Sequence, residues 1–320
     1  MSLTELAADA IPADEEPSGR KIQGRSPFRL AMARLMHDKM AVASVVVLVL
    51  IILFAIGAPL FASWTGHPYG AQYPDLARDS WGLPKGPSKD FWLGADPLGR
   101  DVLVRAAYGA RISLFVGIAA SILATVIGVT VGVLAGYIGG AVDAILARFM
   151  DVVLSFPYLL VAIVIATTFR PHSTWLSLLL TITVIAIFSF AAMARIVRGQ
   201  VISLKEKEFI EAARSLGAGR VRIMFVDILP NLVAPVTVLA SLLVPTSIVF
   251  EATLSFLGVG IQPPMPSWGS MLNDADYRSS LWLLFVPGGL LLLTTLAFNL
   301  LGDGIRDAFD PRSERLITRK

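Results

Sequence analysis

The stretch Glu211-Ala212-Ala213-Arg214-Ser215-Leu216-Gly217, which runs on to Leu229-Pro230-Asn231, decides how the rest of the chain is interpreted. It is polar, it lies between two long apolar segments, and it is too short to form a domain. A compact charged insert between two membrane spans offers a surface that a soluble partner can bind. Its function therefore depends on the topology of the apolar segments around it.

The composition predicts a polytopic helical membrane protein. Of the 320 residues, 55% are hydrophobic and 16% are charged, and the mean hydropathy is +0.69, outside the usual range of soluble domains. Apolar runs of about 20 residues recur, each long enough to cross the hydrocarbon layer of about 30 Å. These runs are continuous, whereas strands of a transmembrane β-barrel alternate apolar and polar residues. The expected fold class is therefore all-α.

Six membrane-spanning helices are expected from the apolar runs. Their approximate positions are 40–63, 112–136, 152–168, 175–194, 231–258 and 281–301. Residues 1–39 form a tail with an amphipathic helix from about residue 26, where Ser26 suits the N-cap and Pro27 the first helical position. This short helix either lies on the inner membrane surface or simply continues into the first span. A hydrophilic loop covers residues 64–110, and residues 304–320 form a basic tail.

Basic residues indicate the orientation, because Lys and Arg are enriched in cytoplasmic segments. With six spans both termini lie on one side, and about 19 of the 27 Lys and Arg residues fall on that side. The polar insert and both termini are therefore expected in the cytoplasm. The net charge of +3 is explained as a topology signal, and no nucleic-acid partner is expected. On the other side, the loop 262–278 is expected to be a stiff lid that places Trp268 at the membrane interface.

The polar insert predicts two short helices set at an angle. Ser203 and Glu206 fit a capping box at the start of the first helix, and Gly217 is suited to end it because glycine takes the left-handed conformation without strain. A second helix would cover 219–226, and Pro230 would open the fifth span. The first helix carries a narrow apolar stripe of Phe209, Ala212, Ala213 and Leu216. Such a slim pair of helices either enters a groove on a partner or forms an ordinary structured loop.

Several kinds of chemistry are not expected of this chain. It contains no cysteine, which excludes disulfides, thiolate metal sites and a cysteine nucleophile. It has no Gly-rich loop ending in Gly-Lys-Ser/Thr, so it is not expected to hold nucleotide phosphates itself. Asp96 and Asp101 flank Pro-Leu-Gly and are interpreted as a turn residue and an N-cap rather than as metal ligands. No catalytic residue, cofactor or metal site is therefore assigned.

Glu251 is the one acidic residue deep within a predicted span, where a charged side chain is costly. It either lines the path of a transported solute or braces neighbouring helices through hydrogen bonds. With Ser255 and Pro245 it forms the candidate substrate pathway. Pro245, like Pro157 and Pro287, interrupts a span and is expected to kink it.

Glu211-Ala212-Ala213, three residues, Gly217 and then Leu229-Pro230 resemble the EAA motif of ABC importer permeases. The chain from about residue 26 to its end is similar to the oligopeptide/dipeptide/nickel branch, specifically to its second permease subunit. The stretches that carry this resemblance are Ala95–Asp101 with Tyr108–Arg111, Asp151-Val152 with Phe156-Pro157, Glu251–Gly258, Pro266–Gly269 and Gly302–Asp307. Two positions depart from the pattern: Asp227 replaces an apolar residue or His, and Ala95 stands where Thr is common.

The resemblance implies a type I ABC importer permease fold with its core over 111–303. It also implies that residues of about 203–227 are coupling helices that seat in an ATP-hydrolysing subunit. The coupling residues so implied are Glu211, Ala212, Ala213, Arg214, Leu216 and Gly217. A homologous permease chain would complete a heterodimer in the bacterial inner membrane, with two ATP-binding subunits inside and a solute-binding protein outside. The expected cargo is a di- or oligopeptide or a related solute such as a nickel chelate.

The alternative function is a secondary transporter or channel that works alone. It requires paired ionisable groups within the spans for ion coupling, and Glu251 is nearly solitary. Inverted repeats are also typical of that class, and none is evident in the sequence. An ATP-driven importer subunit is therefore the favoured interpretation.

Overall fold

The computed structural model describes residues 27–169, 173–275 and 280–309, and this part of the chain is helical with no strand. Five helical segments are long and apolar enough to cross a membrane. They are α2 (Lys39–Ile56), α5 (Val102–Ile138), α8 (Thr174–Lys205), the continuous stretch Arg220–Phe256 and α13 (Trp282–Phe309). A sixth is present if the bent pair α6 (Gly140–Ser155) and α7 (Tyr158–Phe169) counts as one span. The prediction of an all-α membrane protein is confirmed.

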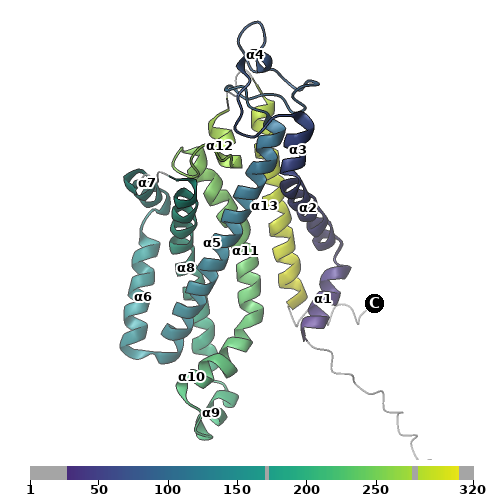
Figure 1. Cartoon of the computed structure of the whole chain (residues 1–320). Helices are drawn as coiled ribbons and strands as arrows, with labels where there is room; N and C mark the ends of the chain where they lie inside the picture. The colour runs from purple at the N-terminus through teal and green to yellow at the C-terminus, as the bar shows by residue number, and fades with distance from the viewer. Residues whose placement is uncertain (1–26, 170–172, 276–279, 310–320) are drawn as a thin grey trace, which may run out of the picture.

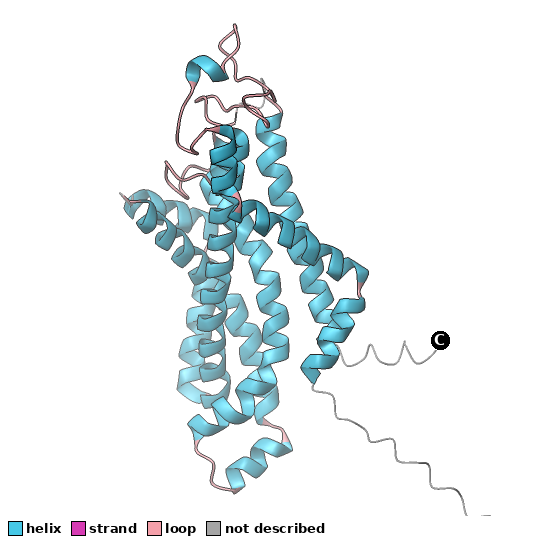
Figure 2. Cartoon of the chain, turned by 45° about the vertical axis from the view of Figure 1, so that its right-hand side comes forward, coloured by secondary structure: helices cyan, strands magenta, loops and turns pink. Residues whose placement is uncertain are grey.

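The helices run between two ends of the molecule that carry different short elements (Figure 1). Helix α4 (Pro74–Ala77) lies at one end, and α9 (Glu208–Ser215) with α10 (Arg220–Arg222) lies at the opposite end. The described loops gather mainly at these two ends (Figure 2). The polar insert is therefore separated from the long loop after the first span by the length of the helix bundle.

The N-terminal helix α1 (Pro27–His37) is separate from the first span. Asp38 separates the two helices and has an extended backbone conformation. Its side chain accepts a hydrogen bond from the backbone N–H of Met40 at 2.9 Å. The predicted short helix is thus present, and it does not simply continue into the span. Ser26, its expected N-cap, lies outside the described residues.

The first two spans have different bounds from those predicted. Helix α2 ends at Ile56, and a short helix α3 (Ala58–Thr65) follows the turn at Gly57. Helix α5 begins at Val102, within the segment 64–110 that was expected to be a loop. It starts early because the side chain of Asp101 caps it, accepting hydrogen bonds from the first free backbone N–H groups. The N-cap interpretation of Asp101 is confirmed.

The loop before α5 is hydrogen-bonded to residues that lie much later in the sequence. The guanidinium groups of Arg100 and Arg105 bond the Oδ2 atom of Asp274 at 2.6 and 3.1 Å. The indole N–H of Trp282 donates to the carbonyl of Ala95 at 3.2 Å. Because these groups join segments far apart in the chain, the loop between α3 and α5 forms a fixed cap on the helices.

The third span is broken at the proline where a kink was expected. Helices α6 and α7 meet at Phe156-Pro157 with a bend of 83°. Proline disfavours the helical conformation in the residue before it, and Phe156 is extended with φ −81° and ψ 137°. Pro157 therefore interrupts the span as predicted. Pro245 and Pro287, by contrast, lie inside the continuous helices α11 (Leu229–Phe256) and α13.

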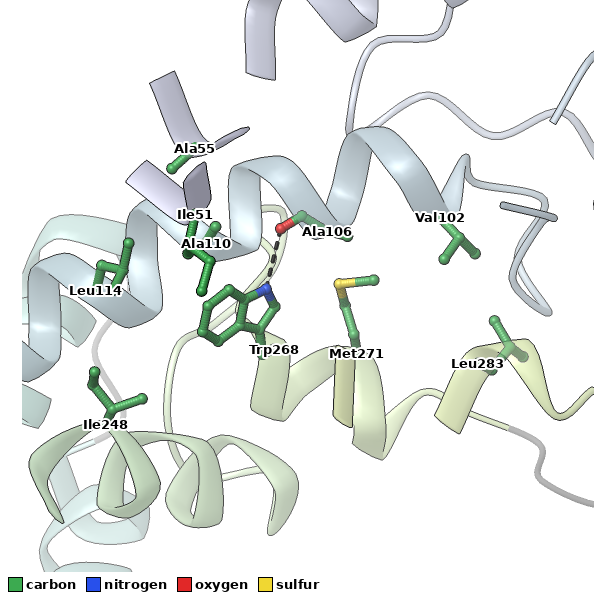
Figure 3. Packing of buried hydrophobic residues seen from close by; sticks show 10 residues of the cluster. All are labelled: Ile51, Ala55, Val102, Ala106, Ala110, Leu114, Ile248, Trp268, Met271 and Leu283. Carbon is green, nitrogen blue, oxygen red and sulfur yellow. Dashed lines mark hydrogen bonds between the residues drawn. The ribbon is translucent and has the colours of Figure 1, made fainter. Parts of the chain in front are cut away.

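The largest buried side chain is Trp268, at the start of α12 (Trp268–Asn273). It is fully buried, and its indole N–H donates to the carbonyl of Ala106 at 3.1 Å (Figure 3). The cluster around it unites α2, α5, α11, α12 and α13 through Ile51, Ala55, Val102, Ala106, Ala110, Leu114, Ile248, Met271 and Leu283. Trp268 was expected at the membrane interface, and its full burial shows that this expectation is wrong. A tryptophan can be buried in a core when its N–H has a hydrogen-bond partner.

Small residues set the spacing of α5 and α8. A Cβ atom at Gly128, Gly132 or Gly136 would lie 2.6 to 2.8 Å from atoms of α8. Glycine at intervals of four residues lets two helix backbones approach closely. This close packing holds α8 against α5 along the part of α8 that leads to the polar insert.

The last helix extends further than predicted. Helix α13 runs to Phe309, so Gly302 and Asp303 lie within it instead of ending it. A Cβ atom at Gly304 would lie 2.7 Å from the Cβ of Ala41. The helix continues because Gly304 packs against α2. This tertiary contact outweighs the low helix propensity of glycine.

Candidate functional site

The polar insert folds as a knuckle, which we define as residues 206–228, between α8 and α11. Its first helix is α9, whose N-cap residue Lys207 makes no side-chain capping bond. Ser203 lies inside α8, so the predicted capping box with Glu206 is not formed. Val201 of α8 is fully buried against Gly136 of α5. This packing extends α8 past the position where local sequence predicts a new helix.

Helix α9 ends as the sequence predicts. Gly217 has φ +83°, the left-handed conformation. Its N–H donates to the carbonyl of Arg214 at 2.9 Å, and the N–H of Ala218 donates to the carbonyl of Ala213 at 3.0 Å. These two bonds form a Schellman motif, which satisfies the last carbonyls of the helix. The chain therefore turns sharply at Gly217.

Ile210 is the fully buried side chain that anchors α9 to the membrane bundle. It lies in a cluster of residues from α5, α8 and the start of the fifth span. The other buried members are Val133, Met193, Val197, Val201, Ile223, Met224, Ile228 and Leu232. Burying an isoleucine contributes roughly 1.5–3 kcal/mol. The burial of Ile210 was not predicted, because the expected apolar stripe lies on another face of the helix.

That stripe faces away from the bundle. Phe209 and Leu216 are 45% and 88% exposed, Ala212 is exposed, and Ala213 is half-buried. Glu211 and Arg214 are also exposed beside the stripe. The guanidinium of Arg214 lies 5.9 Å from the ring centroid of Tyr137, at the end of α5. Of the predicted coupling residues, all but Ala213 are thus exposed, and they are distributed around α9.

The second half of the knuckle differs from the prediction. The expected separate helix over 219–226 is continuous with α11, through α10 and the π-helix η1 (Ile223–Ile228). Pro230 is the second residue of α11, but it does not open the span, because the helix is continuous from Arg220. Proline lacks an N–H and clashes with the carbonyl four residues before it, and a wider turn of the π type relieves this conflict. Movement of the knuckle is therefore transmitted to α11 without an intervening loop.

The second half of the knuckle adds exposed apolar residues to those of α9. Val221 is 65% exposed and Phe225 is 64% exposed. Exposed apolar groups that gather on one projecting element are typical of interaction sites. We call Phe209, Leu216, Val221 and Phe225, with the exposed polar groups of α9, the knuckle surface.

Two ion pairs brace the end of α8 just before the knuckle. Arg198 bonds both carboxylate oxygens of Asp143 on α6, with its Nη2 atom 2.7 Å from Oδ2. Arg195 bonds Asp151 of the same helix at 2.5 Å. A bidentate arginine–carboxylate pair fixes orientation as well as distance. No sequence pattern indicates these pairs, because their partners are distant along the chain.

Glu251 lies within a closed hydrogen-bond network. Its side chain is fully buried, and its two carboxylate oxygens accept from the hydroxyls of Ser113 and Ser255, each at 2.7 Å. Ser113 also accepts from the backbone N–H of Trp268 at 3.2 Å. The network joins α5, α11 and α12, and this geometry favours the helix-bracing interpretation of Glu251. Pro245 is not part of it and lies beside an open groove on α11.

Two family models match the sequence. The model described as binding-protein-dependent transport system inner membrane component matches residues 128–315, more than half of the chain. The model described as the N-terminal TM domain of oligopeptide transport permease C matches residues 26–83. Together they leave residues 84–127 unmatched, which include most of α5.

Several curated proteins are similar over most of their length. The oligopeptide transport system permease protein OppC of Salmonella typhimurium is 46% identical over 91% of this chain and 93% of that protein. OppC of Bacillus subtilis is 39% identical over 95% of each chain. The dipeptide transport system permease protein DppC of Alkalihalophilus pseudofirmus is 41% identical over 90% of each. A solved chain of the MetNI methionine ABC transporter shares the fold, with a TM-score of 0.50 at 19% identity over 63% of this chain and 94% of that chain.

Proposed function

This chain belongs to the family of binding-protein-dependent transport system inner membrane components, and we propose that it is a permease subunit of an ATP-driven importer of peptides. Relatives that match it along nearly their whole length are named for oligopeptide or dipeptide transport. The chain forms half of the translocation pathway. It is not an enzyme, and ATP hydrolysis belongs to separate subunits.

The knuckle surface is the observation that carries this proposal. Leu216 is almost fully exposed, whereas Ile210, on the same short helix, is fully buried. An exposed apolar tip on a rigid base is suited to a groove in a partner, the helix-in-groove mode of recognition. Ala212 keeps the outer face of the helix slim, and Glu211 and Arg214 supply a charged rim.

The proposed partners occupy the two ends of the bundle. Two ATP-binding subunits dock in the cytoplasm, one on this knuckle and one on the homologous permease subunit that completes a heterodimer. A solute-binding protein docks on the opposite, extracytoplasmic cap. In this arrangement both termini are cytoplasmic and the protein lies in the bacterial inner membrane.

The proposed mechanism is a coupled equilibrium between inward- and outward-facing states. ATP binding closes the ATP-binding dimer, and the two knuckles move with it. Because the knuckle of this chain is continuous with α11, its displacement reorients that span directly. ATP drives the transition only to the extent that it binds the two states with different affinity.

The experiment that tests this function is reconstitution of the assembled complex in proteoliposomes. We expect uptake of a labelled tripeptide that requires ATP, both ATP-binding subunits and the binding protein. The proposal fails if this chain, purified alone in mild detergent and reconstituted, transports the peptide without ATP.

A further inference from the structure

A groove of about 370 Å³ follows one side of α11, between the first turn of α7 and the middle of α13. Its lining includes the polar side chains of Thr246, Thr253, Thr295 and Asn299. None of its described lining residues is charged. The groove therefore combines an open, elongated shape with neutral hydrogen-bonding groups.

These polar groups lie at membrane depth. Thr295 is at the middle of α13, which spans Trp282–Phe309, and at 1.5 Å per residue Asn299 is only about 5 Å from that midpoint. A polar side chain in contact with hydrocarbon loses its hydrogen bonds to water at a large cost. A surface that carries an exposed carboxamide at this depth is better suited to a hydrated passage than to lipid.

The rest of α13 provides a contrast. Leu292, Leu293 and Leu296 are 67%, 51% and 51% exposed, as expected for a face in contact with lipid. Asn299 is exposed one turn further on, beside the groove. Asn299 is therefore a polar interruption in the otherwise apolar exposed surface that α13 presents before Asp303.

The hydrogen-bonding capacity of the groove is not fully used. The hydroxyls of Thr246 and Thr253 donate to carbonyls one turn earlier, at 3.1 and 2.8 Å, which leaves their oxygens able to accept. The Thr295 hydroxyl is buried and has no hydrogen-bond partner among the described residues. Buried polar groups without a partner are rare and call for an explanation.

An aromatic pair lines part of the groove. The rings of Tyr158 and Phe250 are 3.8 Å apart between centroids and join α7 to α11. Tyr158 is the first residue of α7, at the 83° break after Pro157. A change in that bend would move Tyr158 relative to the groove.

We propose that this groove is the peptide-contacting wall of the pathway, and that Thr253 and Asn299 bond the neutral amide groups of the peptide backbone. This inference rests on the proposed function. Because no charged residue lines the groove, it accepts peptides regardless of the charge of their side chains. Glu251 and Ser255 position the helices and do not contact the peptide.

Cysteine labelling tests the placement of the groove, since the chain has no cysteine of its own. Thr253→Cys and Asn299→Cys are made singly, assembled into the full complex and reconstituted in lipid nanodiscs. We expect a hydrophilic maleimide to label both, and a transported tripeptide to protect both. Leu296→Cys is the lipid-facing control, and it should react at least about tenfold more slowly because a thiol must ionise in water to react. Labelling no faster than that control, or labelling seen only in the isolated chain, overturns the proposal.

Substitutions test the chemistry of recognition. Thr253→Val removes the hydroxyl without changing shape, and we expect about threefold to tenfold slower uptake from one lost hydrogen bond. Thr237→Val is the matched control, because Thr237 lies on the same helix with the same backbone bond, to the carbonyl of Val233 at 2.7 Å, outside the groove. Equal uptake by the two variants contradicts the proposal.

A charge placed in the groove gives an independent readout. Wild-type uptake should vary little between acidic, neutral and basic tripeptides, whereas Asn299→Asp should favour basic over acidic tripeptides by at least about tenfold. An unchanged ratio overturns the groove assignment while wild-type import still supports the proposed function. If the wild-type complex imports no tripeptide at all, the proposed function itself fails.

Discussion

Arg198 bonds both carboxylate oxygens of Asp143 and so ties α8 to α6 directly above the knuckle. The two side chains are 30% and 22% exposed, whereas those of the neighbouring pair Arg195–Asp151 are 54% and 52% exposed. Partial burial reduces the screening of a charge pair by water. Variants of the two pairs can therefore be compared for the stability that each ion pair between α8 and α6 contributes.

We predict that Arg198→Ala destabilises the protein by about 1 kcal/mol and that Arg195→Ala costs less than about 0.5 kcal/mol. The measurement is the melting temperature of the purified complex in detergent. The double variant Arg198→Asp with Asp143→Arg should recover part of the loss. Equal shifts for both arginines would contradict the bracing role of Arg198.

Gly217 should tolerate substitution poorly because its φ is +83°. An alanine in the left-handed conformation costs about 1–2 kcal/mol, so Gly217→Ala should displace α9 and reduce peptide-dependent ATP hydrolysis. Gly219 is the control in the same knuckle, since its φ is −69° and a Cβ there meets nothing within 4 Å. We expect Gly219→Ala to retain wild-type hydrolysis. Similar losses in both variants would show that bulk, not backbone conformation, matters.

Neighbouring residues on α9 should have opposite effects. Ile210→Ala leaves a cavity under the knuckle and should cost about 2–5 kcal/mol of stability. Phe209→Ala removes an exposed ring and should leave the melting temperature nearly unchanged, while weakening the binding of the ATP-binding subunits. Thermal unfolding and a titration of those subunits onto the permease separate the two effects. The reverse pattern would contradict the assignment of the two faces.

Glu251 should behave as a brace. Glu251→Gln retains groups that can bond the hydroxyls of Ser113 and Ser255, because a hydroxyl can either donate or accept. We expect it to import peptide nearly as wild type does. Glu251→Leu leaves the O–H groups of both serines without their acceptor, at about 1–3 kcal/mol each, and should lower the melting temperature. Loss of uptake in Glu251→Gln with unchanged melting would instead place Glu251 in the pathway.

The sequence allowed the fold class, the spans and the site of the knuckle to be predicted, because each depends on local signals. Apolar runs mark the spans, and Gly217 marks the end of α9 through its backbone conformation. The same signals failed at Ser203 and at the start of α5. In both places packing between distant segments determines where a helix starts or continues.

The features of the site that escaped prediction are all long-range. Ile210 differs from the exposed residues of α9 only in the face it occupies, which depends on where the helix packs. The groove combines residues of three helices, and the pair Tyr158–Phe250 joins positions that share no sequence pattern. Such sites follow from tertiary structure, so a single sequence cannot reveal them.

The central claim is that the knuckle surface couples this permease to ATP-binding subunits. The most direct measurement compares peptide-dependent ATP hydrolysis and tripeptide uptake of the reconstituted complex bearing Glu211→Lys or Leu216→Asp with those of the wild type. Because both side chains are exposed, the variants should still insert and pair with the second permease subunit. The account predicts that each loses at least about tenfold in both activities, as expected when a central interface residue is replaced by a charge. Full uptake together with normal retention of the ATP-binding subunits in both variants would contradict it.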